Sequence, residues 1–141
     1  MGWVASNTEV ADILRDYRDY TMICAGVFDD MVATLVLENK EAILERNRQI
    51  VEENLALMDT WIAKETKASW IRPASVSTSF VKLDVDCPIE DFALELLQDY
   101  GVLVVPGNRF DKESHVRIGY CCDKEVLQKG LEKLSQFLNK C

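Results

Sequence analysis

The hydrophobic residues in the middle of the chain recur with the period of a helix. Between Asn39 and Glu65 no glycine or proline interrupts the pattern. This segment is longer than the roughly 8–20 residues of most globular helices, so we expect a helix that braces two layers or two domains. Its apolar face is wide and consists of Leu44, Val51, Leu55, Met58 and Ile62, with Ile43, Ile50, Leu57 and Trp61 beside them.

The residues before this helix predict a strand followed by helices. The segment 2–7 is short and largely apolar, Thr8 and Glu9 open a helical pattern, and a second helical pattern begins near Asp29. A single strand leaves its backbone donors and acceptors unpaired. We therefore interpret the first thirty or so residues as a remnant of a larger structure.

The second half of the chain alternates short strand patterns with helical ones, which is typical of a small α/β sandwich. We expect a mainly antiparallel sheet covered by helices, to which the long helix is connected. The predicted elements are a strand at 78–85, a helix from Pro88 that ends before a left-handed Gly101, strands at 102–105 and 116–120, and a last helix capped by Asp123.

Composition and charge exclude several classes of protein. The 141 residues are 48% hydrophobic and 28% charged, unlike a disordered or low-complexity chain. A net charge of -8 repels phosphate backbones and anionic lipids, so we expect neither nucleic acid nor a membrane as partner. No apolar run approaches the roughly 20 residues of a membrane helix, and the start of the chain lacks a secretory pattern. We expect a cytoplasmic location.

The cysteines do not predict a metal site. There are five of them, without paired CxxC spacing or a nearby histidine cluster. Two are adjacent, Cys121 and Cys122, and neighbours rarely pair without strain. We expect reduced, partly buried thiols in a reducing compartment, and no metal.

Arg117 is the first candidate for chemistry. In the predicted strand it lies on the face opposite Val116 and Ile118, and a guanidinium on a rigid strand can grip a carboxylate through two parallel hydrogen bonds. A solvated arginine on an edge strand is the alternative. The turn 106–110 contains a glycine that allows close backbone approach, so it could border a ligand or simply connect two strands.

The other polar candidates are weaker. His115, the only histidine, has no carboxylate or serine at a motif spacing, so we interpret it as a surface or hydrogen-bonded residue. Asp84 and Asp86 supply only part of an oxygen cage and fit a solvated strand end better. The phosphate-loop, nucleophile-elbow, zinc-protease and dinucleotide motifs are absent from the sequence. The residues alone therefore indicate an α/β domain that could bind a carboxylate.

Several ordered motifs resemble the C-terminal end of the class I/II aminotransferases, which are pyridoxal-phosphate enzymes of fold type I. The stretch Tyr100–Phe110, the strand Val116–Tyr120 and a last helix containing Gly130-Leu131 follow the family's order. The segment 2–7 resembles the one just after the cofactor-binding lysine, where R-x-GW is common, with Met1 at the x. The stretch 73–76 departs from the family because it lacks a glycine.

This resemblance implies a division of roles along the chain. Residues 1–38 would be a remnant of the large cofactor-binding domain, and residues 39–141 the small domain with its long connecting helix. Arg117 would hold the substrate α-carboxylate, and Phe80 and Asn108 would line the pocket mouth. The resemblance places the Schiff-base lysine and the other catalytic and cofactor-binding groups upstream, so it assigns none of them to this chain.

The resemblance also implies the activity of the complete enzyme. It would transfer an amino group between an amino acid and a keto acid with pyridoxal 5′-phosphate, and would form homo-oligomers. We expect this chain, without the N-terminal large domain, to bind no cofactor and to be inactive. The alternatives are carbon–sulfur lyase or cyclising chemistry on the same cofactor, and a non-catalytic module that binds carboxylates or amino acids or forms dimers.

Overall fold

The structure of the chain is a computed structural model that describes residues 2–74 and 76–140 and divides into two compact units, Met1–Glu45 and Arg46–Cys141. Met1, Ser75 and Cys141 lie outside the described residues, and with them the match of Met1 to the x of R-x-GW, part of the 73–76 departure and the fifth cysteine. The assignment of 1–38 and 39–141 to two different domains stays a prediction.

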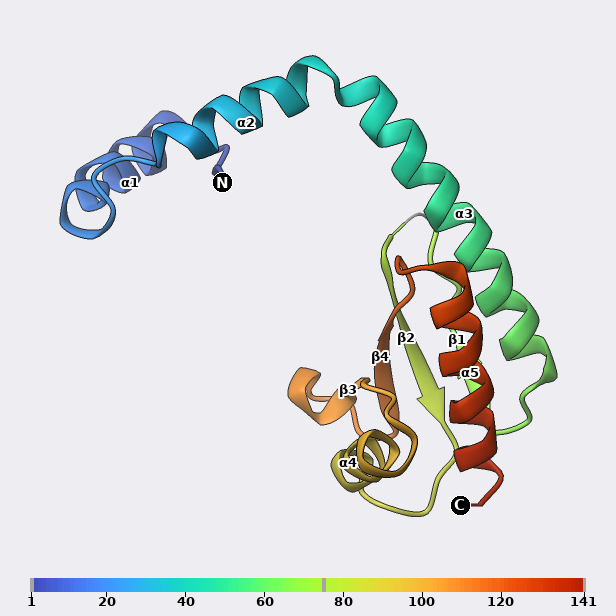
Figure 1. The fold of residues 1–141 in the computed structure, drawn as a ribbon. Coiled ribbons are helices and arrows are strands. Elements are labelled where there is room, and N and C mark those ends of the chain that lie inside the picture. The colour runs from blue at the N-terminus through green and yellow to red at the C-terminus, as the bar shows by residue number, and fades with distance from the viewer. Residues whose placement is uncertain (1, 75, 141) are drawn as a thin grey trace. The chain divides into compact units, whose positions relative to one another are not determined.

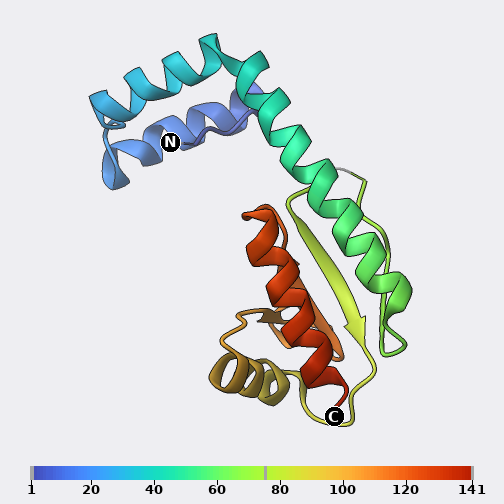
Figure 2. The same cartoon turned by 45° about the vertical axis from the view of Figure 1, so that its right-hand side comes forward.

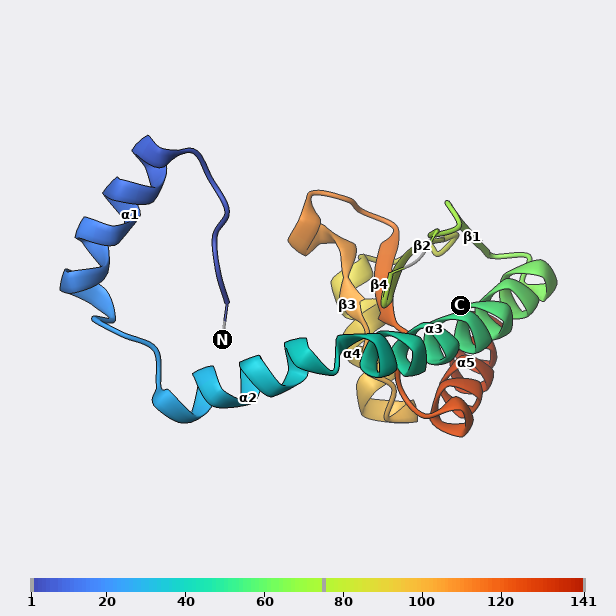
Figure 3. The same ribbon diagram turned by 90° about the horizontal axis from the view of Figure 1, so that it is seen from above.

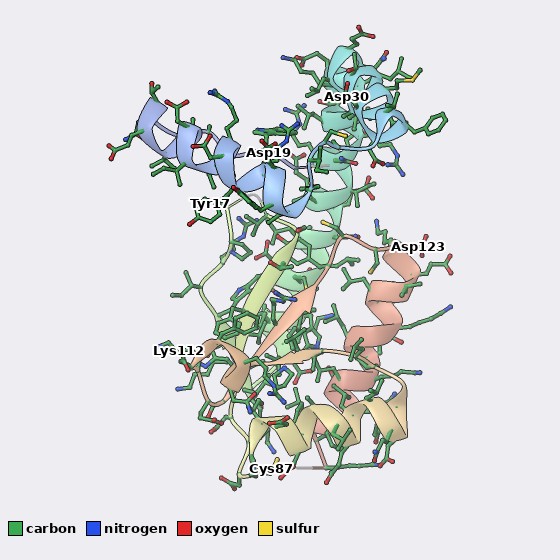
Figure 4. All side chains as sticks on the ribbon, turned by 90° about the vertical axis from the view of Figure 1, so that its left-hand side faces the viewer. Tyr17, Asp19, Asp30, Cys87, Lys112 and Asp123 are labelled. Atoms are coloured by element: carbon green, nitrogen blue, oxygen red, sulfur yellow. The ribbon has the colours of Figure 1, made fainter. Side chains whose placement is uncertain are left out.

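The first unit contains the helices α1 (Thr8–Thr21) and α2 (Val27–Glu38). The Asn7 side chain caps α1 by accepting a 3.0 Å hydrogen bond from the Val10 backbone. The strand predicted at 2–7 is wrong: these residues have no regular structure, because no other strand of the described chain pairs with them (Figure 3). Neither α1 nor α2 has a buried residue. Figure 4 labels Tyr17 and Asp19 on α1 and Asp30 on α2.

The second unit is built on a four-stranded antiparallel sheet, as the sequence predicts. The strands follow the order β1-β2-β4-β3, so β2 and β4 are the inner pair. Their bounds are Ala68–Trp70 for β1, Thr78–Leu83 for β2, Val105–Pro106 for β3 and His115–Gly119 for β4.

Strand β3 is shorter than the predicted strand at 102–105. Only Val105 and Pro106 pair with β4. The residues before them complete the end of the preceding helix, where Gly101 has a left-handed φ of 66° and the Val102 N–H donates to the Leu96 carbonyl at 3.4 Å. The pairing with β4 therefore begins only at Val105. Leu103, which precedes it, is 75% exposed.

Three helices cover one face of the sheet (Figures 1 and 2). They are α3 (Lys40–Lys64), which agrees with the predicted long helix, α4 (Ile89–Tyr100) and α5 (Lys124–Leu138). Helices α3 and α5 lie side by side, and the Trp61 indole N–H donates to the Ser135 hydroxyl at 2.8 Å. Fully buried core residues come from each layer and include Met58, Val81, Leu83, Leu96, Val116, Leu134 and Leu138.

Hydrogen bonds of two side chains, one buried and one at a helix cap, fix the end of β4 and the start of α5. Asn54 on α3 donates its side-chain amide to the carbonyls of Tyr120 and Cys122 at 2.7 and 2.9 Å. Asp123 caps α5, as predicted, by accepting from the backbone of Glu125 and Val126. These contacts hold β4 in a fixed register against the helical layer. Across residues 2–74 and 76–140, no helix combines the length and apolar character needed to traverse a lipid bilayer.

Candidate functional site: a cationic face of the sheet

The side chains of β4 alternate between the two faces of the sheet. Val116 and Ile118 are buried against the helices, and Arg117 is exposed on the opposite face, which confirms the predicted orientation. Arg117 pairs with Phe80 of β2 on one side and with Val105 of β3 on the other. The edge-strand position in the alternative is therefore wrong, because β4 has a neighbour on each side, while a solvated Arg117 without a ligand agrees with its exposure.

The sheet concentrates positive charge in an acidic protein. Its described strands carry two cations, Lys82 and Arg117, and no aspartate or glutamate, whereas the whole chain has a net charge of -8. Lys82 pairs across the strands with His115, the neighbour of Val116 on β4. Because the strands supply no counter-charge to these two cations, their exposed face favours anions over cations.

The guanidinium of Arg117 is available for a ligand. Within residues 2–74 and 76–140 it makes no ion pair and no side-chain hydrogen bond. Its contact is with the ring of Phe110, whose centre lies 5.1 Å from the guanidinium carbon. A ring offers a guanidinium no oxygen acceptor, so this contact does not take the place of a carboxylate's hydrogen bonds.

The turn after β3 brings Phe110 to this position. It forms a short 3-10 helix, η1 (Gly107–Phe110). A Cβ at residue 107 would lie 2.3 Å from the Lys112 carbonyl oxygen and 2.6 Å from that of His115, so only glycine fits there. The close approach is to the chain's own backbone, and a ligand at this turn stays a prediction. Lys112 marks the connection to β4 in Figure 4.

Asn108 and Arg109 of this turn both bind Glu90 at the start of α4. The Asn108 amide donates to one Glu90 carboxylate oxygen at 2.8 Å, and Arg109 pairs with the other. The side-chain oxygen of Asn108 is buried and has no partner among the described residues. The structure thus gives Asn108 a role in fixing the turn, and its role in substrate binding stays a prediction.

Phe80 lies between two other rings on the same face. It meets Phe110 edge to face at 5.9 Å and stacks on His115 at 4.9 Å. His115 is hydrogen-bonded, as expected, since its Nδ1 lies 2.8 Å from the Glu113 carbonyl oxygen. No local pattern predicts the contacts of Glu90, because they join residues 18 and 19 positions apart.

The site is an open face rather than a closed pocket. Two cavities of about 550 Å³ each lie in this unit. One lies between the 101–104 segment and α5, the other between α3 and α5, and neither is lined by Arg117, Phe80 or Asn108. A ligand on Arg117 would therefore need a second surface to enclose it.

The groups around Arg117 do not fit pyridoxal phosphate by themselves. A phosphate needs several converging N–H or O–H donors. The buried unpartnered atom at this site is the Asn108 side-chain oxygen, an acceptor, and the nearest groups are aromatic rings. Among the described residues at this site, the Arg117 guanidinium has the donors for one carboxylate. The described residues of the chain contain no group of three or more His, Cys, Asp or Glu that could hold a metal ion.

The thiols lie on the surface, so the expectation of partial burial is wrong for the four cysteines described. Cys24, Cys87, Cys121 and Cys122 are all exposed. The adjacent pair lies in the connection between β4 and α5, outside the helical layer. Residual burial raises the pKa of the Cys121 thiol, and the neighbouring Cys122 adds to that increase.

The fold and the site define a small α/β domain with an exposed arginine on an inner strand. The family model for "Aminotransferase class I and II" matches residues 1–134. The chain belongs to the class I and II aminotransferase family, which confirms the resemblance found in the motifs.

Individual relatives agree with this family. A crystal structure of a PLP-dependent aminotransferase from Streptococcus suis 89-1591 is 66% identical, with a TM-score of 0.94 over 99% of this chain and 37% of that one. Capreomycidine synthase from Streptomyces vinaceus is 27% identical, over 98% of this chain and 36% of that protein. An aspartate aminotransferase from Thermotoga maritima is 24% identical, over 99% of this chain and 35% of that protein. The chain thus spans little more than a third of each relative's length.

Proposed function

We propose that this chain acts as the C-terminal part of a pyridoxal-phosphate-dependent aminotransferase, in which Arg117 binds the α-carboxylate of the amino-acid or keto-acid substrate. The observation that carries the proposal is the Arg117 guanidinium, held on an inner strand and without an ion-pair partner in the described chain. The family match supports the class of reaction. Pyridoxal phosphate would supply the electron sink of the complete enzyme.

The proposed contribution of Arg117 is binding and orientation. Its two parallel N–H groups would fix both carboxylate oxygens, and a rigid strand would fix the direction of the guanidinium. Holding the carboxylate in this way sets the orientation of the α-carbon, which accelerates a reaction without any bond to the arginine. Phe80 and Asn108 would border the same ligand, as the resemblance implies.

The remaining part of the enzyme would enclose this open site. Large apolar side chains of the first unit, among them Phe28 at 84% exposed, need a covering surface. We propose that an N-terminal large domain covers them and supplies the lysine and the cofactor contacts, and that the complete enzyme forms a homo-oligomer. The chain alone would then be inactive.

A chimera tests this proposal. This chain replaces the matching C-terminal part of the Streptococcus suis aminotransferase, and transamination is measured with a panel of amino acids. We expect an active chimera, an inactive isolated chain and a loss of kcat/KM of about 100- to 10,000-fold for Arg117→Ala, because two charge-assisted hydrogen bonds are removed. Full activity of the Arg117→Ala chimera would contradict the proposal.

Inactivity of the isolated chain has its own test. The chain is mixed with pyridoxal phosphate, treated with borohydride and analysed by peptide mass spectrometry. We expect no stoichiometric label on any single lysine. One fully labelled lysine, together with transamination by the chain alone, would show that the catalytic groups are present after all.

The unpaired Arg117 also supports a second candidate, a module that binds carboxylates without chemistry. Calorimetry of the isolated chain with amino acids and dicarboxylates separates the two candidates. Saturable binding that Arg117→Ala abolishes, combined with an inactive chimera, would favour the module. Product analysis of an active chimera would distinguish transamination from carbon–sulfur lyase or cyclising chemistry.

A further inference from the structure

The side chain of Arg117 contacts an aromatic ring rather than an acidic side chain. An arginine on a solvent-facing strand ordinarily samples many rotamers, and fixing it costs conformational entropy. In this structure the guanidinium lies over the Phe110 ring, 5.1 Å from its centre. An acidic side chain would accept the N–H hydrogen bonds that a carboxylate ligand needs, whereas an aromatic ring attracts the cation without an oxygen acceptor.

The ring of Phe110 contacts the ring of Phe80, which itself stacks on a third ring, that of His115. Phe80 presents its ring to Phe110 at an interplanar angle of 84°, and His115 stacks on Phe80 with an angle of 19°. We call Phe110, Phe80 and His115 the aromatic row. Phe80 and His115 lie on the inner strands β2 and β4, so the row is anchored in the rigid part of the sheet.

The backbone that carries Phe110 is fixed independently of the row. Glu90 binds the two residues before Phe110, and the Lys112 N–H donates to the Gly107 carbonyl at 3.0 Å. Gly107 packs directly against two backbone carbonyl oxygens, which leaves the turn little room to shift. The position of Phe110 therefore follows from α4 and from the sheet together.

We propose that Phe110 is a positioning residue that preorganises Arg117 for carboxylate binding, with Phe80 and His115 as its support. The inference rests on the proposed function of Arg117 as the carboxylate-binding residue. Phe110 acts through Arg117: the ring restricts the guanidinium to the orientation in which its N–H fork points away from the ring. Truncating the ring leaves the charge in place but lets it sample other directions.

The spectroscopic test uses the full 141-residue chain. In NMR spectra the side-chain protons of Arg117 should show an upfield ring-current shift that Phe110→Leu removes and the conservative Phe110→Tyr retains. Phe80→Leu should reduce the shift, since it removes the support but not the ring in contact. An unchanged Arg117 spectrum in Phe110→Leu would overturn the inference without reference to activity. Backbone spectra identify any variant that fails to fold. If Phe110→Leu fails to fold, the Phe110→Tyr variant decides, because loss of the Arg117 shift in that variant would overturn the inference.

The kinetic test uses the Streptococcus suis chimera described above, with an amino acid and the corresponding amine that lacks the carboxylate. We expect Phe110→Leu to lower kcat/KM for the amino acid about 2- to 5-fold, mainly through KM, and to leave the amine unaffected. If Arg117→Ala changes the preference for the amino acid but Phe110→Leu does not, only the positioning role fails. If Arg117→Ala does not change it, the proposed function fails.

Discussion

Arg117 and Asn54 show two opposite uses of a polar side chain in this fold. Asn54 is only 2% exposed, and its amide is consumed by the carbonyls of Tyr120 and Cys122. Arg117 is exposed and its N–H groups have no such acceptor in the described chain. The first side chain therefore serves stability, and the second has the exposure that the proposed binding of a carboxylate requires.

Replacing Asn54 should destabilise the protein strongly. Asn54→Ala leaves two carbonyl oxygens at the end of β4 without their donor, and a buried unsatisfied polar group costs about 1–3 kcal/mol. Asn47→Ala is the matched control, since Asn47 lies on the exposed side of the same helix. Urea unfolding followed by tryptophan fluorescence measures both. Equal stabilities of the two variants would contradict the assigned role of Asn54.

Tyr120 should make stability depend on pH in the alkaline range. Burial raises the pKa of its hydroxyl, and the neighbouring Cys121 thiol adds to the increase. The folded chain thus holds this proton more tightly than the unfolded chain. The contribution to stability is complete below the unfolded pKa of about 10 and is lost as pH rises through the higher folded-state pKa.

Urea unfolding from about pH 9 to about pH 11 checks this, in a Cys121→Ser background that removes the raised pKa of that thiol. We expect the free energy of unfolding to fall with pH, and to fall less steeply when Tyr120→Phe is added. Identical slopes with and without Tyr120→Phe would show that this hydroxyl titrates normally in the folded protein.

At the scale of elements, helices were predictable and strands only in part. The bounds of α3 and α5, the Asp123 cap and the left-handed Gly101 follow from local periodicity and capping chemistry. A strand depends on a partner distant in sequence. The segment 2–7 therefore has strand-like residues but no ladder, and β3 keeps two residues because the end of α4 holds those before it.

At the site, too, local patterns predict only those features that do not depend on residues distant in sequence. The face of Arg117 follows from the alternation of β4, which is a local property. Its inner position depends on the pairing order of the sheet. The contact between Phe80 and Phe110 joins residues thirty positions apart, and that of Glu90 with Asn108 follows from the packing of α4. No local pattern encodes these contacts.

The short helix η1 has no room for a side chain at Gly107. Gly107→Ala should cost several kcal/mol or prevent folding, because the Cβ would overlap two backbone oxygens. Gly130→Ala is the matched control: nothing lies within 4 Å of the added Cβ, and Gly130 is inside α5. It should stabilise the protein by about 0.5–1 kcal/mol. Thermal unfolding of both variants checks the prediction, and a harmless Gly107→Ala would contradict the close packing of the turn.

At the scale of the whole molecule, the two units differ in what they bury. No residue from 2 to 45 is buried, whereas the second unit contains the entire hydrophobic core of the described chain. A helix that is apolar nearly all round, such as α2, is ordinarily covered by other structure. We therefore expect the second unit to fold by itself. We expect the apolar side chains of the first unit to need another surface to cover them.

Deleting residues 1–45 should leave a folded protein. We expect the 46–141 chain to unfold cooperatively in urea, to bind far less of a hydrophobic fluorescent dye than the full chain and to associate less in light scattering. Loss of cooperative unfolding on truncation would show that the first unit contributes to the core. The full chain at the same concentration is the reference.

Arg117 is proposed to recognise the carboxylate of an amino-acid substrate. The most direct measurement is the ratio of kcat/KM for an amino acid to kcat/KM for the matching amine without a carboxylate, in the Streptococcus suis chimera with and without Arg117→Ala. We predict that the substitution lowers this ratio about 100- to 10,000-fold by reducing activity on the amino acid alone. A ratio that stays unchanged would contradict the claim.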